Sequence, residues 1–207
     1  MNEYIAHEDI EKKFQKLNTI IIGLPGSGKS SLMDSFSIKP NYLSLGEVTR
    51  RELIDGGPMA DIIRSKFQTS ETWLPEFVVG IVAPYILKAK EENQGFVLDG
   101  VPRKMSEAVS LAQWLDEHDL RIDLLLSLHI SPEKAWERIN TDQTRNSSTR
   151  LEMIAHYETR MRIYQEEEEA LLEKMQKVAK YYLNIDTNNN PHGFAKNLLD
   201  EFIASHF

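Results

Sequence analysis

Residues 23–30 read GLPGSGKS and directly follow the apolar run TIII at 19–22. The spacing G-x-x-x-x-G-K-[ST] after an apolar run indicates a phosphate-binding loop, because glycines permit a backbone whose N–H groups converge on phosphate oxygens. A helical segment begins near Lys29, and its N-terminus would add the positive end of a helix dipole. The glycine order differs from the dinucleotide fingerprint G-x-G-x-x-G. The stretch therefore predicts a nucleotide site but leaves the reaction open.

The side chains of this loop have predicted tasks. Lys29 would reach the β- and γ-phosphates of a nucleoside triphosphate, and a hydroxyl from Ser30 or Ser31 would face Mg²⁺. The predicted nucleotide-binding residues are Gly23, Pro25, Gly26, Ser27, Gly28, Lys29, Ser30 and Ser31.

Short apolar runs alternate with segments of helical period along the chain. The strand candidates are Thr19–Gly23, Tyr42–Leu45, Phe96–Leu98, Leu124–Ile130 and Tyr181–Ile185. The helical candidates are Lys29–Phe36, Glu47–Ile54, Met59–Phe67, Pro75–Glu92, Ser106–His118, Pro132–Ile139 and Leu151–Lys180, and Pro191–Phe207 closes the chain. This alternation predicts an α/β fold with three layers, in which helices cover both faces of a doubly wound, five-stranded parallel sheet. Ligands of such folds bind at the carboxyl ends of the strands.

A second motif, GFVLDGVPRK at residues 95–104, fits this placement. Its apolar strand ends in Asp99, a carboxylate that could hold Mg²⁺ or its water shell beside the phosphate-binding loop. Arg103 could bind a second phosphate through its planar guanidinium group.

Composition narrows the class of protein. A chain of 207 residues can form one domain with a substantial core. The absence of cysteine excludes disulfides, thiolate zinc sites and cysteine nucleophiles. The net charge of −8 argues against general nucleic-acid binding. The sequence shows neither a membrane span nor a secretory signal. We therefore expect a monomeric, cytoplasmic protein that binds neither nucleic acid nor membrane.

Taken together, the motifs resemble those of the nucleoside monophosphate kinases, a family of P-loop proteins. The resemblance is strongest to the adenylate kinase type. LSLGEVTRREL (43–53) is similar to the family's I-S-T-G-D-x-x-R segment, and GFVLDGVPRK resembles its G-F-x-x-D-G-x-P-R signature. LLLSLHISPEKAWERI (124–139) resembles the strand and helix that lead to the lid of these enzymes. Arg138 takes the position of an arginine in that helix, and Arg160 and Tyr164 resemble the arginine and tyrosine after the lid.

The resemblance implies reversible transfer of a phosphoryl group from ATP·Mg²⁺ to a nucleoside monophosphate. It also implies positions for the two substrates and the cofactors ATP and Mg²⁺. The implied catalytic residues are Lys29, Arg103, Arg138, Arg150 and Arg160. The implied acceptor-binding residues are Leu45, Gly46, Arg50, Gly100, Arg103 and Glu107, and Ser31 and Asp99 would hold Mg²⁺ through water. Such an arrangement suits phosphoryl transfer, which requires positioning and neutralised charge.

The resemblance further implies one kinase domain over residues 1–207. Its parts would be an N-terminal extension (1–16), a core (17–46, 95–139 and 151–207), a monophosphate-binding subdomain (47–94) and a short lid (140–150). Residues 140–150 read NTDQTRNSSTR, a polar stretch without apolar period. Within the subdomain, Glu47 to about Phe67 would move as a flap over the acceptor.

Two departures from the family concern the acceptor base. Leu45 replaces a threonine, and Glu107 replaces a glutamine that pairs with adenine. Because an ionised carboxylate only accepts hydrogen bonds, Glu107 would suit guanine, with donors on N1 and N2, better than adenine. The amino group of cytosine is also an option. We expect specificity to shift away from a clean AMP preference.

Further departures concern the lid. Asp142 replaces an arginine, and Leu151 and Glu152 replace paired aspartates. Losing one charge-stabilising contact can lower a rate by about 10²–10³-fold. Two alternatives to an active monophosphate kinase therefore remain: a catalytically weakened nucleotide-binding protein of the same fold, and another small-molecule kinase with the same loop.

Overall fold

The computed structural model describes residues 7–57, 59–69, 73–141, 154, 157–189 and 193–207. Five parallel strands form one sheet in the order β2-β3-β1-β4-β5. The strands are β1 (Asn18–Ile22), β2 (Tyr42–Ser44), β3 (Phe96–Asp99), β4 (Ile122–His129) and β5 (Ala179–Asp186). All five lie where the apolar runs predict them, which confirms the parallel α/β sheet.

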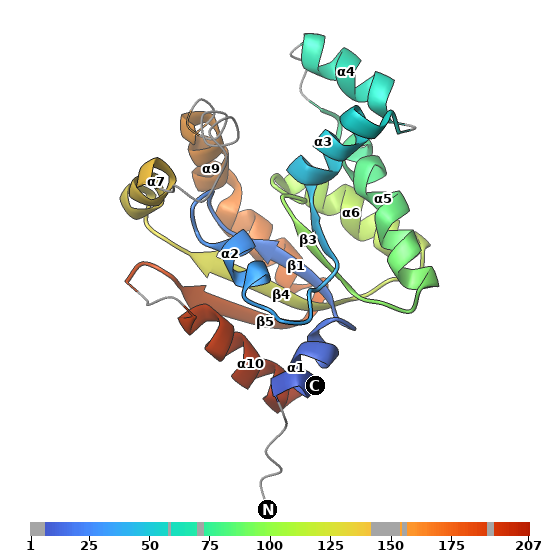
Figure 1. Cartoon of the computed structure of the whole chain (residues 1–207). Helices are drawn as coiled ribbons and strands as arrows, with labels where there is room; N and C mark the ends of the chain where they lie inside the picture. Colours follow the sequence, from blue (N-terminus) through green and yellow to red (C-terminus); the bar gives the residue numbers. More distant parts are fainter. Residues whose placement is uncertain (1–6, 58, 70–72, 142–153, 155–156, 190–192) are drawn as a thin grey trace, which may run out of the picture.

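Helices cover both faces of this sheet (Figure 1). They are α1 (His7–Phe14), α2 (Lys29–Asp34), α3 (Leu45–Asp55), α4 (Ala60–Thr69), α5 (Pro75–Glu91), α6 (Met105–Glu117), α7 (Pro132–Thr141), α9 (Tyr157–Gln176) and α10 (Phe194–His206). No helix in the described ranges has both the length and the apolar character needed to cross a membrane.

The strands alternate their side chains between two hydrophobic cores. Ile20 and Ile22 of β1 belong to the core shared with α3, α5, α6 and α9. Ile21 between them belongs to the core shared with α1, α2 and α10. Because successive side chains of a strand point to opposite faces, an unbroken apolar run such as β1 requires cover on both sides. The three layers are therefore a direct consequence of the apolar strands.

The sheet reverses its winding direction at β1. This strand pairs with β3 on one side and with β4 on the other. The chain reaches β2 and β3 first and crosses to β4 and β5 later. In doubly wound sheets such a switch point leaves a crevice at the carboxyl ends of the strands. The GLPGSGKS loop follows β1 and lies at that crevice.

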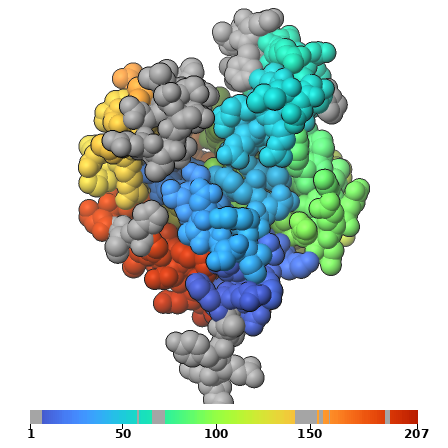
Figure 2. Space-filling model, in the orientation of Figure 1, coloured from blue at the N-terminus to red at the C-terminus, as the bar shows by residue number. Residues whose placement is uncertain are grey.

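One part of the molecule stands away from the sheet. In Figure 1, α3 and α4 extend beyond the carboxyl edge of the strands, and in Figure 2 the same part of the chain (cyan) projects from the body of the molecule. We call residues Glu47–Phe67, which form most of these two helices, the acceptor flap, after the role that the sequence predicts for them. The flap joins the body through α3, whose Val48 is buried with α5 in the first core.

Two predicted boundaries are wrong. The predicted helix Leu151–Lys180 runs too far, because α9 ends at Gln176 and Lys180 lies in β5. The start of the edge strand AKYYLNID directly follows the glutamate-rich α9. Its side chains alternate between half-buried and exposed, so its sequence pattern is a weaker strand signal than the continuous apolar run of a buried strand. Leu45, assigned to a strand, is instead the first residue of α3.

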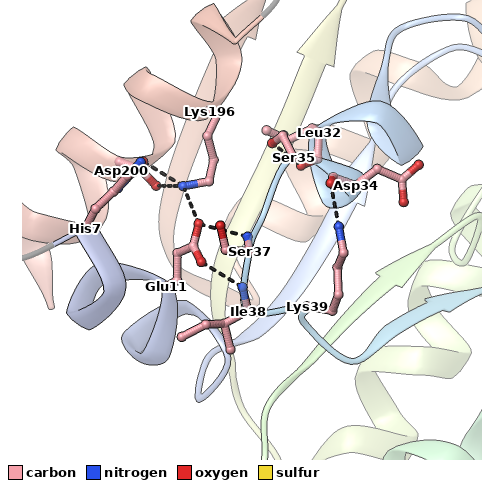
Figure 3. Close-up of polar contacts among 10 residues, drawn as sticks. All are labelled: His7, Glu11, Leu32, Asp34, Ser35, Ser37, Ile38, Lys39, Lys196 and Asp200. Carbon is pink, nitrogen blue, oxygen red and sulfur yellow. Dashed lines mark hydrogen bonds and ion pairs between the residues drawn. The ribbon is translucent and has the colours of Figure 1, made fainter.

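The two chain ends fold against each other. Helix α1, which lies in the predicted N-terminal extension, packs on α10. Figure 3 shows a polar cluster where these helices meet the segment that follows α2. Residues 140 and 141 end α7, while the rest of the predicted lid lies outside the described residues.

Candidate nucleotide site

A cavity of about 260 Å³ opens at the carboxyl edge of the sheet. It lies between the GLPGSGKS loop, the ends of β2 and β3, the start of α3, and α9. The residues that line it are Ile21, Ile22, Gly23, Pro25, Gly26, Gly28, Lys29, Ser30, Tyr42, Ser44, Gly46, Glu47, Arg50, Asp99, Gly100, Pro102, Arg103, Ile163, Tyr164 and Leu171. Both sequence motifs therefore contribute to one cavity.

The loop adopts a backbone that glycine makes accessible. Gly26 and Gly28 have φ angles of 89° and 98°, in the left-handed region that side chains rarely adopt. A Cβ at Gly26 would also lie 2.7 Å from the Ala135 carbonyl oxygen of α7. These glycines let the loop turn tightly from β1 into α2 while packing against α7.

Lys29 reaches back over this loop. Its ammonium group donates to the carbonyl oxygens of Gly23 at 2.6 Å and Leu24 at 3.0 Å, and its Nζ lies 3.9 Å from Oδ1 of Asp99. The side chain is largely buried, so its positive charge is held beside the cavity. A cation fixed here can attract the phosphates of a nucleotide.

The two serines that follow Lys29 differ in position. Ser30 lines the cavity, whereas Ser31 is exposed and is not part of the lining. Ser27, another predicted nucleotide-binding residue, is buried behind the loop and does not line the cavity either.

The oxygens beside the loop fit a magnesium ion. Asp99 ends β3 at the cavity, and its Oδ2 accepts a hydrogen bond from the Tyr42 hydroxyl. Mg²⁺ in nucleotide sites takes one or two protein oxygens and completes its shell with water and phosphate. Asp99 and Ser30 supply such oxygens next to a loop suited to phosphate. Within the described residues, His, Cys, Asp and Glu form no group of three or more that could hold a metal.

Two arginines also line the cavity. The Arg50 guanidinium lies 3.5 Å from where a Cβ of Gly46 would stand, and the Arg103 guanidinium lies 2.8 Å from the equivalent point on Gly100. Each glycine thus leaves room for the arginine that its own motif supplies. Two guanidinium groups at one cavity can bind a second phosphate.

Glu107 and Leu45 are both buried and outside the cavity lining. Leu45 packs in the core beneath α3. Glu107 lies in the first turn of α6, where its Oε2 accepts the backbone N–H of Arg103 at 2.7 Å. Burial raises the pKa of Glu107, while the hydrogen bond and positive charge of Arg103 act in the opposite direction. The Glu107 carboxylate is therefore engaged by the backbone of Arg103 and Lys104, in the motif that carries Arg103.

Of the remaining predicted arginines, only Arg138 has a described side chain. Arg138 of α7 donates to the carbonyl oxygens of Thr187 and Asn188 after β5 and does not line the cavity. Arg160 belongs to α9, but its side chain lies outside the described part of the structure, as do Arg150 and Asp142 entirely. For these residues the predicted roles stay predictions.

Sequence reasoning missed several lining residues, among them Tyr42, Ser44 and Glu47. Tyr42 stands two residues before the end of β2 and lines the cavity because β2 pairs with β3, a pairing that the sequence does not show. Tyr164 of α9 also lines the cavity. Its hydroxyl donates to Glu168, and burial followed by this hydrogen bond raises the pKa of Tyr164.

Comparison with known proteins agrees with this geometry. The family model described as adenylate kinase matches residues 21–180. Similar curated proteins are adenylate kinases from Thermococcus onnurineus (29% identical), Streptococcus sanguinis (30%) and Staphylococcus epidermidis (32%). The alignments cover 60%, 60% and 59% of this chain, and 55%, 59% and 58% of those relatives. The chain therefore spans less than two thirds of their length. Because the family model covers more than half of the chain and includes both motifs, this chain belongs to the adenylate kinase family.

Proposed function

We propose that this protein transfers a phosphoryl group from ATP to a nucleoside monophosphate. One observation carries the proposal: a single cavity brings the phosphate-binding loop and Lys29 together with Asp99, Arg50 and Arg103. A site for one nucleotide would need only the first of these groups. Two phosphate-binding ends in one cavity suit the transfer of a phosphoryl group between two bound nucleotides.

The residues would act by position and charge. The loop N–H groups and Lys29 would bind the β- and γ-phosphates of ATP, and Arg50 and Arg103 would hold the acceptor phosphate in line with them. When bound between Asp99 and Ser30, Mg²⁺ would neutralise charge that develops on the transferring group. Arg138, Arg150 and Arg160 would add positive charge on closure. Such preorganised charges are a major source of rate enhancement.

The parts of the chain would divide the work as the family resemblance implies. Residues 47–94 would form the monophosphate-binding subdomain and 140–150 a short lid, both carried by the core. Closure of the two would exclude water, which otherwise accepts the phosphoryl group and wastes ATP. We further propose that the protein acts as a cytoplasmic monomer without nucleic-acid or membrane partners, in keeping with its net charge of −8.

The acceptor base is proposed to be read near Glu107. Glu107 is buried and does not line the cavity, so a base would reach its Oε1, the oxygen that the Arg103 N–H does not engage, only once the site closes on the acceptor. When ionised, this oxygen accepts and cannot donate. We therefore propose a base that presents N–H donors, guanine ahead of cytosine, as the preferred acceptor.

A coupled assay with ATP·Mg²⁺ and a panel of AMP, GMP, CMP, UMP and dTMP tests the function. We expect turnover with at least one monophosphate and a drop of at least about 100-fold in kcat for Lys29→Ala, the cost typical of a lost charge-stabilising contact. Lys39→Ala is the matched control, because Lys39 is exposed and bonds the Asp34 carbonyl oxygen. Absence of turnover with every monophosphate would contradict the proposed function.

A further inference from the structure

Asp99 has a different neighbour on each carboxylate oxygen. Oδ2 accepts the hydrogen bond of the Tyr42 hydroxyl, while Oδ1 lies 3.9 Å from Nζ of Lys29. The carboxylate is therefore oriented in a defined way, with one oxygen toward β2 and the other toward the phosphate-binding loop. This orientation depends on a residue outside both sequence motifs.

The sheet explains how Tyr42 reaches Asp99. Strands β2 and β3 are parallel, with Tyr42 paired to Val97 and Ser44 paired to Asp99. Tyr42 and Ser44 share one face of the sheet because they are two residues apart, so a side chain at Tyr42 can extend along that face. Its phenol ring has the length to span those two residues.

Packing holds the ring of Tyr42 in place. It is half-buried against the core that α1, α2 and α10 share with Val97. A phenol ring fixed by packing keeps its hydroxyl at one position, so the hydrogen bond to Asp99 requires little further ordering. Tyr42 also lines the nucleotide cavity, together with Asp99.

We propose that Tyr42 is a positioning residue for phosphoryl transfer: its hydroxyl fixes the Asp99 carboxylate so that Oδ1 is presented to Mg²⁺ bound with ATP beside Lys29. The inference rests on the proposed function in naming ATP·Mg²⁺ as the ligand. Partners that orient a metal-binding carboxylate commonly change metal affinity by about 10–100-fold when they are removed. Tyr42 touches the carboxylate and acts on the ion through it.

The test measures binding, not turnover. Titration calorimetry gives the Kd of ATP for the whole chain in EDTA and at saturating Mg²⁺, and the ratio of the two is the Mg²⁺ coupling. We expect Tyr42→Phe to lower this ratio by about tenfold. In an Asp99→Asn background, Tyr42→Phe should lower it no further, because the carboxylate through which Tyr42 acts is absent.

Tyr164→Phe is the matched control. Tyr164 lines the same cavity, but its hydroxyl donates to Glu168 and not to Asp99. Its loss should leave the coupling ratio at the wild-type value. An equal loss in Tyr164→Phe, an unchanged ratio in Tyr42→Phe, or no Mg²⁺ coupling in the wild type would each overturn the inference.

The transfer assay on the same preparations separates this inference from the proposed function. If Tyr42→Phe loses coupling while the wild type transfers phosphate to no monophosphate, the positioning role stands and the proposed function fails. If transfer proceeds and the coupling is unchanged in Tyr42→Phe, the proposed function stands and the positioning role fails.

Discussion

Glu107 is a titratable group at the position where base reading is proposed. Burial raises its pKa above the ordinary 4.5 of a glutamate side chain, against the opposing effect of Arg103. A protonated Glu107 gains an O–H donor and so offers one donor and one acceptor, as a glutamine does. An ionised Glu107 offers acceptors alone. The two protonation states therefore suit different bases.

The base preference should consequently depend on pH. As pH rises above 4.5 and Glu107 ionises, we expect kcat/KM for GMP relative to AMP to increase by about tenfold, the size of one hydrogen bond to a charged group. The ratio cancels the ionisation of the two monophosphate groups, which is common to both substrates. Steady-state kinetics with both nucleotides across the pH range would measure it.

Glu107→Gln supplies the control for this pH dependence. The amide has the donor and acceptor at every pH, so the GMP to AMP ratio should become flat and favour AMP. A ratio that changes with pH equally in the wild type and in Glu107→Gln would assign the effect to another group.

At the level of single residues, the two motifs indicated several residues that line the cavity but not their neighbours. Lys29, Asp99, Arg50 and Arg103 all line one cavity because each follows a motif tied to a strand end. Tyr42 was missed because its role depends on which strand lies beside β3. That neighbour relation comes from tertiary pairing and has no local sequence signal.

Among the elements, the acceptor flap is tied to the core by a buried carboxylate. Glu52 of α3, which is 8% exposed, accepts the Tyr85 hydroxyl of α5 at 2.8 Å and the Met59 N–H at 3.2 Å. Burial, followed by the hydrogen bond to Glu52, raises the pKa of Tyr85. Arg50 lies two residues before Glu52 on the same helix, so this anchor also sets the position of the arginine that we propose binds the acceptor.

Tyr85→Phe should remove the hydrogen bond that the Tyr85 hydroxyl donates to Glu52 and so weaken the attachment of α3 to α5. We expect the KM for the monophosphate to rise by about threefold to tenfold, in line with about 1 kcal/mol for one hydrogen bond, while the KM for ATP stays unchanged. Two-substrate steady-state kinetics separates the two constants.

Asp61→Asn is the comparison within the same flap. It removes the partner of an ion pair with Arg64 in which both side chains are exposed, so little change is expected. Equal increases in both KM values for Tyr85→Phe would show that Glu52 supports the whole site instead of the flap.

Element boundaries show where sequence reasoning is limited. The sequence located the buried strands because their apolar runs are continuous. The strand predicted at β5 was too short, because this edge strand carries exposed lysine and tyrosine side chains. Likewise, Leu45 appeared to continue a strand because it is apolar. It is instead the first residue of α3, and its apolar side chain packs in the core beneath the flap.

At the scale of the whole molecule, a buried cluster of charged side chains connects the terminal helices α1 and α10 to the segment that follows α2. Lys196 of α10 bonds both Asp200 oxygens at 2.7 Å and lies 3.3 Å from Glu11 of α1 (Figure 3). Glu11 also accepts the backbone N–H groups of Ser37 at 3.2 Å and Ile38 at 2.8 Å, just after α2. The cluster therefore connects the terminal helices to the segment between the phosphate-binding loop and β2.

The pKa of Glu11 predicts when this cluster stabilises the fold. Burial acts to raise that pKa, but the N–H groups of Ile38 and Ser37, together with Lys196, outweigh burial and lower it below 4.5. A group whose folded pKa is depressed contributes stability above its unfolded pKa, and that stability is lost as pH falls through the folded value. Glu11 should thus stabilise the protein at neutral pH and progressively less below about pH 4.5.

Glu11→Gln tests this contribution through urea unfolding. At pH 7 the variant should lose about 1–3 kcal/mol of unfolding free energy, because a buried ammonium and two N–H groups lose a charged acceptor. The difference from the wild type should shrink as the pH falls below 4.5, where the wild-type carboxylate protonates. Glu8→Gln on the same helix breaks only an exposed pair with Lys12, so it should change stability by less than about 1 kcal/mol. A Glu11→Gln effect that is constant with pH would show that shape, and not charge, holds the chain ends to the segment after α2.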